Sequence, residues 1–246
     1  MKVDLEVLVA LSDVEITGQS LVLRQHLNRN LYLRTHKVLE AAGGRWSRKE
    51  HAHLFASDPT ARIEQILLTG EITVPKDFGF FPTPAVMVAH LIELAEIEPW
   101  MLTLEPSAGD GAIARELARL ATVECFEILP EKVAALREEG FARTVFAQDF
   151  LQAAPTSRYD RVVMNPPFAL RGDIRHVLHA LHFLRPEGRL VSVMSAGILF
   201  RKDRLTREFR ALLERRGARV EANPPESFRV AGTRVSTVTV GIPAVR

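Results

Sequence analysis

The chain has 246 residues, a hydrophobic fraction of 47% and a formal net charge of +2, the values of a folded globular protein and not of a disordered or fibrous one. It has no apolar run of the ~20 residues that cross a bilayer, and charges interrupt the N-terminus where a signal peptide would be apolar, so we expect a cytoplasmic protein without membrane contacts. Its single cysteine, Cys125, excludes an internal disulfide framework and a cysteine-rich metal site.

Residues 1–76 are predicted to form a small separate α+β module. The segment GRWSRKEHAHLF (44–55) has the pattern of a short hairpin, and SDP at 57–59 opens a helix that Gly70 closes. This module does not share the alternating rhythm of the longer C-terminal part of the chain.

From Phe81 onward, apolar strands alternate with helical segments, which predicts a doubly wound α/β sheet. The first helix is expected over 84–97, with Thr83 as N-cap and Pro84 at the first helical position. Further helices are expected from 112, after 130, and over 173–184 and 204–216. Strands are expected over 101–105, 123–127, 144–147, 161–165, 189–195 and 218–222, the last paired with the tail 234–242.

The segment LEPSAGDG (104–111) places a glycine-rich turn between a strand and a helix, where α/β sheets bind nucleotides. The third glycine of a dinucleotide fingerprint is missing, and no lysine completes a P-loop. Glu105 and Asp110 would repel phosphates and favour a ligand with an ammonium or sulfonium group. The alternative is an ordinary tight turn.

Two acidic positions follow later strands. Glu127 lies about twenty residues after the glycine turn, where a carboxylate can accept hydrogen bonds from both ribose hydroxyls; taken alone, it is equally a solvated strand end. Asp149 offers an acceptor for an exocyclic amino group, and Phe150 a ring for the face of an adenine, although such a pair is often only a cap and a core residue.

The stretch VVMNPPF (162–168) is the most specific signal. Asn165 offers a side-chain acceptor, the proline that follows fixes the direction of a carbonyl, and Phe168 can stack on a planar ring. Two acceptors that face one point suit an amino group with two hydrogens. The alternative is a prolyl turn that only ends a strand.

Together FFPTP (80–84), LEPSAGDG, Glu127, QDF (148–150) and NPPF (165–168) resemble the ordered motifs of S-adenosylmethionine-dependent amino-group DNA methyltransferases, in the order of the gamma-type N6-adenine enzymes. The resemblance runs from about residue 80 to the end and includes SFRVAGTRVSTVTV (227–240). Residues 1–76 lie outside it, with only a vague likeness to leader segments of phage and plasmid enzymes. It implies a class I methyltransferase domain over 77–246, with a Rossmann-like seven-stranded sheet whose last strand is antiparallel.

The resemblance also implies S-adenosylmethionine as the cofactor, above the carboxyl ends of the first four strands of this sheet. Thr83 would contact the methionine carboxylate, the turn 105–111 would lie beneath the methionine, Glu127 would hold the ribose, and 149–150 the adenine. The implied cofactor-binding residues are Phe81, Pro82, Thr83, Glu105, Pro106, Ser107, Ala108, Gly109, Asp110, Gly111, Glu127, Ile128, Asp149, Phe150 and Asn165.

The implied catalytic residues are Asn165, Pro166, Pro167 and Phe168. Asn165 and the Pro166 carbonyl would bind the target amino group, and Phe168 would stack on the base. This agrees with the chemistry, because the lone pair of an adenine amino group is delocalised and acceptors on both hydrogens favour the pyramidal form that attacks. The sulfonium is already activated, so no metal and no covalent enzyme intermediate are needed. A base within a duplex must first be flipped out.

Basic clusters at 24–53 and 201–219 each carry a balance of +5 and are candidates for phosphate contacts, with solvated faces as the alternative. Of 32 basic residues only six are lysines, and the arginine excess suits phosphate recognition or reflects genome composition or a heat-adapted host. The candidate nucleic-acid contacts are Arg45, Trp46, Arg48, Lys49, Arg171, Arg201, Lys202 and Arg204.

The leading hypothesis is therefore an N6-adenine methyltransferase that acts on nucleic acid, with DNA favoured over RNA. The chain lacks a large target-recognition domain, so we expect low specificity or a short site. The alternatives are an RNA base methyltransferase (adenine N6 or guanine N2) and a non-catalytic nucleic-acid-binding partner with the same fold. A glutamine-methylating enzyme is disfavoured because position 168 is not Tyr. His176, His179 and His182 share a helix without the Cys or carboxylate pattern of a metal site.

Overall fold

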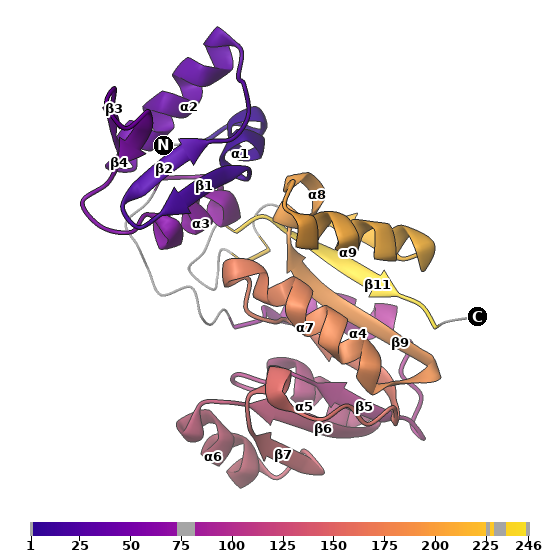
Figure 1. The fold of residues 1–246 in the computed structure, drawn as a ribbon. Helices are drawn as coiled ribbons and strands as arrows, with labels where there is room; N and C mark the ends of the chain where they lie inside the picture. The colour runs from indigo at the N-terminus through magenta and orange to yellow at the C-terminus, as the bar shows by residue number, and fades with distance from the viewer. Residues whose placement is uncertain (1, 73–81, 225–226, 229–234, 245–246) are drawn as a thin grey trace.

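The computed structural model describes residues 2–72, 82–224, 227–228 and 235–244. Two sheets form its framework, a four-stranded sheet within the first 54 residues and a seven-stranded sheet that starts at residue 102 (Figure 1). In this described part, no helix is both long and apolar enough to cross a membrane.

The N-terminal sheet is antiparallel throughout, with the strand order β1-β2-β4-β3. Its strands are β1 (Val14–Thr17), β2 (Ser20–Leu23), β3 (Arg45–Ser47) and β4 (Ala52–Leu54), and its helices are α1 (Leu5–Leu11), α2 (Arg29–Ala41) and α3 (Thr60–Thr69). The expected hairpin is β3–β4, and the expected helix is α3, which ends where Gly70 takes a left-handed φ of 66°. The side chains of Asp4 and Asn28 cap α1 and α2, two helices that the apolar pattern did not predict.

The seven-stranded sheet has the order β10-β11-β9-β8-β5-β6-β7. Its strands are β5 (Leu102–Glu105), β6 (Thr122–Glu127), β7 (Thr144–Ala147), β8 (Tyr159–Met164), β9 (Leu184–Ser195), β10 (Arg219–Ala222) and β11 (Thr237–Ile242). Strands β5 to β9 run parallel, and β11 pairs antiparallel with both of its neighbours. The predicted sheet with an antiparallel last strand is confirmed.

Helices cover both faces of this sheet. Successive side chains of a strand point to opposite faces, and on β8 Val162 and Met164 belong to one apolar cluster while Val163 belongs to another. Helices α7 (Gly172–Ala180) and α9 (Arg204–Arg215) cover the first cluster, and α4 (Ala85–Ala95) and α5 (Ala112–Leu120) cover the second. Beside α5, helix α6 (Pro130–Glu139) packs on the buried Cys125. The chain is thus doubly wound, as its pattern predicted.

The start of α4 differs from the expectation. The helix begins at Ala85, its N-cap is Pro84 in an extended conformation, and no side chain caps it. The hydroxyl of Thr83 instead accepts a hydrogen bond from the amide of Asn165. A contact with a residue 82 positions away has replaced the local cap.

Four short helices escaped prediction. They are α8 (Gly197–Phe200) and the 3-10 helices η1 (Phe150–Gln152), η2 (Ala169–Arg171) and η3 (Leu181–Phe183). The last of these takes the end of the helix expected over 173–184, and β9 starts five residues before the expected strand.

The N-terminal module packs against the larger part of the chain. The contact lies where α3 of the module comes near α8 of the larger part (Figure 1). Leu68 of α3 belongs to the apolar cluster beneath α4, and Phe200 of α8 packs on the core of the module. An ion pair between Glu64 and Arg201 joins the same two helical regions. The two parts therefore share a packed interface.

Candidate active site

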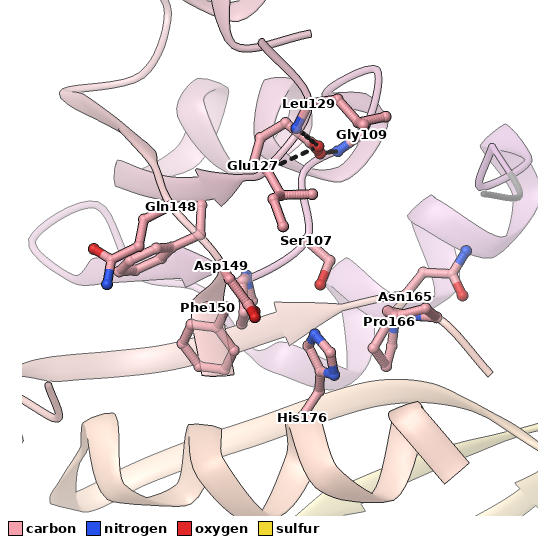
Figure 2. Close-up of a pocket in the computed structure, with 14 residues that line it drawn as sticks. Ser107, Gly109, Glu127, Leu129, Gln148, Asp149, Phe150, Asn165, Pro166 and His176 are labelled. Atoms are coloured by element: carbon pink, nitrogen blue, oxygen red, sulfur yellow. Dashed lines mark hydrogen bonds between the residues drawn. The ribbon is translucent and has the colours of Figure 1, made fainter. Parts of the chain in front are cut away.

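A cavity of about 560 Å³ lies at the carboxyl ends of β5, β6, β7 and β8. The strand order reverses between β5 and β8, and such a switch point leaves a crevice above an open parallel sheet. Its lining residues are Pro106, Ser107, Gly109, Phe126, Glu127, Ile128, Leu129, Gln148, Asp149, Phe150, Asn165, Pro166, Pro167 and His176 (Figure 2). Residues that follow four different strands thus meet in one place, as the sequence predicted.

The glycine turn after β5 forms one wall. Gly109 and Gly111 both take left-handed φ angles, of 54° and 76°, which favour glycine over residues with side chains. A Cβ atom at Gly111 would lie 2.6 Å from Cδ2 of Leu136, so the turn also packs closely on α6. The turn therefore borders the cavity with the backbone of Gly109 and with Pro106 and Ser107.

Glu127 is held rigidly at the end of β6. Its Oε2 accepts the amide N–H of Gly109 at 2.7 Å, and its Oε1 accepts those of Ile128 and Leu129 at 2.9 and 2.8 Å (Figure 2). Three backbone donors fix one carboxylate between the glycine turn and the loop after β6. Ile128, whose side chain is 63% exposed, forms an apolar rim beside it.

The other two acids of the glycine turn do not line the cavity. Glu105 is 2% exposed, and burial raises the pKa of its carboxyl well above the ordinary value, which favours the neutral form. Asp110 is exposed, and its Oδ1 accepts a hydrogen bond from Nζ of Lys132 at 2.9 Å. The carboxylates that line the cavity are Glu127 and Asp149, and the role expected for Glu105 and Asp110 beside a cationic ligand stays a prediction.

Asp149 and Phe150 form the wall after β7. Oδ1 of Asp149 accepts the N–H of Leu151 at 2.9 Å, and Figure 2 shows the carboxylate pointing into the cavity. The ring of Phe150 is 2% exposed and packs among Phe126, His179 and Phe183. This aromatic packing fixes the floor of the cavity beside a carboxylate acceptor.

The opposite wall is formed by Asn165, Pro166 and Pro167, directly after β8. Nδ2 of Asn165 donates to Oγ1 of Thr83 at 3.0 Å. This bond orients the amide, because it directs the NH₂ group at Thr83. Thr83 and Asn165, which belong to two separate motifs, thus meet in space.

Phe168 does not stand beside the cavity. Its ring is 2% exposed and belongs to the apolar cluster that includes Leu91, Val191 and Phe228. In this conformation it is a core residue, so the expected stacking surface for a base is not presented. The apolar ring finds more surface to bury inside the domain than at the cavity.

His176 is a lining residue that the sequence did not identify as functional. Nδ1 of its imidazole lies 2.8 Å from the carbonyl oxygen of Gly172, which can only accept, so Nδ1 carries the proton and Nε2 is an acceptor in the neutral ring. Burial lowers the pKa of His176 from its ordinary 6.5, which favours that neutral ring. Figure 2 shows the ring between Asp149 and Pro166. Its position near the N-terminus of α7, the helix that follows β8, was the available signal.

Three more positions are implied for the cofactor. Phe81 lies outside the described residues, Pro82 is exposed, and Ala108 is 5% exposed. Cys125 is fully buried, and burial raises the pKa of its thiol to about 12. Besides His176, the lining residues missed from the sequence are Phe126, Leu129 and Gln148.

His179 of α7 serves packing and hydrogen bonding. Nε2 of His179 donates to the carbonyl oxygen of Ala153 at 3.0 Å, and its ring contacts Phe150 and Phe183. The described residues hold no group of three potential metal ligands.

The candidate nucleic-acid contacts fall into two groups. Arg45, Arg48 and Lys49 are exposed on the hairpin β3–β4, together with Trp46, which is 39% exposed. In the second group, Lys202 donates to Gln25, Arg204 pairs with Glu208, and Arg171 pairs with Glu64.

The prediction for Arg201 is wrong. Its side chain is only 4% exposed and forms a two-pronged ion pair with Glu64, so it cannot reach a phosphate. The sequence alone predicted an exposed guanidinium at Arg201, but packing between the two parts of the chain buries it against Glu64.

The seven-stranded sheet, with its antiparallel last strand and its cavity at the carboxyl ends of the parallel strands, is a class I methyltransferase fold. Residues 104–216 match the family model described as "Methyltransferase small domain". The family match and this fold support an S-adenosylmethionine-dependent methyltransferase. No curated protein matches the sequence significantly.

Solved structures share the fold. A modification subunit assigned to a type I restriction enzyme from Vibrio vulnificus YJ016 is 15% identical (TM-score 0.58), with 68% of this chain and 45% of that one covered. The type I restriction-modification methyltransferase subunit from Streptococcus thermophilus is 18% identical (TM-score 0.58), with 70% and 46% covered. A protein named as an RNA methyltransferase from Pyrococcus horikoshii is 23% identical (TM-score 0.52), with 71% and 92% covered. This chain therefore aligns with less than half the length of the Vibrio vulnificus and Streptococcus thermophilus subunits.

Proposed function

We propose that this protein transfers a methyl group from S-adenosylmethionine to the exocyclic N6 of an adenine in nucleic acid, with DNA as the favoured substrate. The observation that carries the proposal is the amide of Asn165, oriented by Thr83 at 3.0 Å and placed beside Pro166 on the wall of the cavity. An amide oxygen and a carbonyl held at a strand end suit a donor with two hydrogens.

The cavity residues also fit the cofactor. The carboxylate of Glu127, fixed by three backbone N–H groups, is placed to accept hydrogen bonds from ribose hydroxyls, and Asp149 to accept one from the adenine amino group. Ile128 and Leu129 offer apolar surface to a purine. When bound, the cofactor supplies an activated methyl carbon.

The residues of the chain then act by positioning. The oxygens of Asn165 and Pro166 accept both hydrogens of the target amino group, which favours the pyramidal nitrogen and directs its lone pair at the methyl carbon. With the cofactor held there, its sulfonium would supply the methyl group and leave as the neutral thioether, and the target nitrogen would release one proton to solvent. Both acceptors are part of the fold before substrate arrives, so little reorganisation is required.

The proposed contact with nucleic acid rests on exposed basic side chains and an exposed tryptophan. The exposed hairpin β3–β4 offers Arg45, Arg48 and Lys49 to phosphates and Trp46 to a base. We propose that residues 1–76 form a module that contributes these contacts to the methyltransferase domain at 77–246. A target adenine must leave its duplex to reach the acceptors at 165–166.

Transfer of labelled methyl groups from S-adenosylmethionine to unmodified DNA, RNA and protein, followed by nucleoside analysis, tests this function. N6-methyladenine in DNA is the expected product. N6-methyladenine or N2-methylguanine in RNA alone would replace the DNA substrate with RNA. Label on protein alone, 5-methylcytosine as product, or no transfer to any fraction by a chain that binds nucleic acid would overturn the proposal.

A further inference from the structure

Glu64 of α3 connects the N-terminal module to the loop after the 165–168 motif. Its two oxygens accept Nη1 and Nη2 of Arg201 at 3.1 and 2.9 Å, and Oε1 also accepts Nη1 of Arg171 at 3.3 Å. The side chains of Glu64 and Arg201 are 12% and 4% exposed, so this pairing is shielded from solvent and from salt. The arginine fork matches the carboxylate in its two-pronged geometry.

The loop that Arg171 belongs to is conformationally strained. Leu170 and Arg171 take consecutive left-handed φ angles of 51° and 61°, a conformation that is unfavourable for residues with a side chain. The side chain of Leu170 is 48% exposed, so its burial offers little compensation. A strained conformation persists only where its surroundings hold it.

The backbone of this loop lies against the catalytic motif. A Cβ atom at Gly172 would stand 2.6 Å from the carbonyl oxygen of Pro167, so the turn folds back directly onto the prolines. Phe168, Arg171 and Arg201 border one small space of about 10 Å³ together with Asp173, which shows that the ion pairs sit beside the motif. A shift of Arg171 would therefore be transmitted to the position of Pro166 and Asn165.

The charge of the buried Arg201 also acts on Asp173, which borders the same small space. The pKa of Asp173 is raised to about 6 by burial, while N–H donors from Ser195 and Ile174 and the charge of Arg201 act in the opposite direction. Asp173 opens the first turn of α7, the helix that carries His176 to the cavity. Glu64, through Arg201 and Arg171, thus reaches both the loop and the helix after β8.

We propose that Glu64 is a positioning residue for methyl transfer: by holding Arg171, it keeps the loop 168–172 in the conformation that presents Asn165 and Pro166 to the target amino group. The inference rests on the proposed function and assigns the N-terminal module a part in the reaction in addition to nucleic-acid contact. Arg171 then acts through the loop and not as a phosphate ligand.

Two variants of the full chain test this role. Arg171→Ala removes the ion pairs of the loop with Glu64 and Asp203 and leaves the buried Glu64–Arg201 pair in place, so the variant should fold. Glu64→Gln keeps the shape of the side chain and removes its charge. Glu208→Gln, in an exposed pair with Arg204, is the matched control.

For Arg171→Ala we expect kcat for methyl transfer to nucleic acid to fall by a factor on the order of 100, because small misplacements of reacting groups have effects of this size. KM for nucleic acid and Kd for S-adenosylmethionine should change less than about twofold. Hydrogen exchange in 168–172 should become faster in both variants and stay unchanged in the control. The double variant Glu64→Gln, Arg171→Ala should lose less activity than the product of the two single losses, since the two variants share the Glu64–Arg171 contact.

Three outcomes would overturn the inference. They are an unchanged exchange rate in 168–172 of Arg171→Ala, an unchanged kcat, and a salt-dependent rise in KM with kcat intact, which would identify Arg171 as a phosphate contact. If the wild-type chain methylates no nucleic acid, the proposed function fails by that result alone. The exchange rates and the affinity for S-adenosylmethionine then still report whether Glu64 holds the loop.

Discussion

The two walls of the cavity are held in different ways. On the side of Glu127, the hydrogen bonds that hold the carboxylate join residues close in sequence: Gly109 is 18 positions away, Ile128 is one and Leu129 is two. On the side of Asn165, they span 82 residues to Thr83 and, for Arg171, 107 residues to Glu64. The wall expected to bind the cofactor is thus held by contacts between residues close in sequence, whereas the wall expected to bind the amino group is held by contacts with distant segments of the chain.

The largest expected loss of activity comes from a variant that should affect methyl transfer but not cofactor binding. Asn165→Ala removes an acceptor required only for the amino group, so methyl transfer should fall by about 1000-fold or more, while Kd for S-adenosylmethionine changes little. Isothermal titration and single-turnover transfer measure the two quantities.

Thr83→Val is the companion variant, because it keeps the shape of the side chain and removes the oxygen that orients the Asn165 amide. We expect it to lose activity by a smaller factor, about 10-fold, which corresponds to one hydrogen bond. Joint loss of transfer and cofactor binding in Asn165→Ala would mean that the walls are not separable.

Glu127→Gln addresses the other wall. Three backbone N–H groups point at this carboxylate, and a Gln amide would direct its own N–H₂ at one or more of them, leaving buried donors unpaired. We expect Kd for S-adenosylmethionine to rise by about 10- to 100-fold, with an accompanying loss of thermal stability. Full affinity in this variant would contradict the assignment of Glu127 to the cofactor.

The smallest expected effect concerns pH. Burial lowers the pKa of His176 from 6.5, so the ring stays neutral at neutral pH and its Nε2 accepts hydrogen bonds in the cavity. As the pH falls below 6.5, the unfolded chain takes up this proton before the folded one, and the folded state loses stability until the pH passes the lowered pKa. Once the folded ring is protonated, the acceptor is lost as well.

We therefore expect affinity for S-adenosylmethionine to fall a few-fold on acidification through that range, and His176→Asn to remove this dependence. Titrations at a series of pH values with both chains provide the measurement. An identical pH profile in the variant would mean that His176 only lines the cavity.

Much of this site could be predicted because its signals are local. The apolar strands, the glycine turn and the polar residues after β5 to β8 each lie within one short stretch, and parallel strands bring their carboxyl ends to one edge regardless of the loops between them. That is why Glu127, Asp149 and Asn165 were found and meet as expected.

The features that could not be predicted depend on contacts across the chain. Phe168 resembled a stacking ring, but it is a core residue here because α4 and the strands offer it apolar surroundings. Arg201 resembled a phosphate ligand, but Glu64 of the N-terminal module binds it. Thr83 resembled a helix cap, but Asn165 donates to its hydroxyl. In each case a local pattern was overridden by a partner far away in sequence.

The burial of Cys125 has a practical consequence for labelling the protein. Its thiol is fully buried and ionises only near pH 12, so thiol reagents should leave the native chain unmodified. Since the sequence has no second cysteine, one introduced at an exposed position such as Arg48 would be the sole reactive handle. A fluorophore attached there would report on the β3–β4 hairpin in the otherwise unaltered protein.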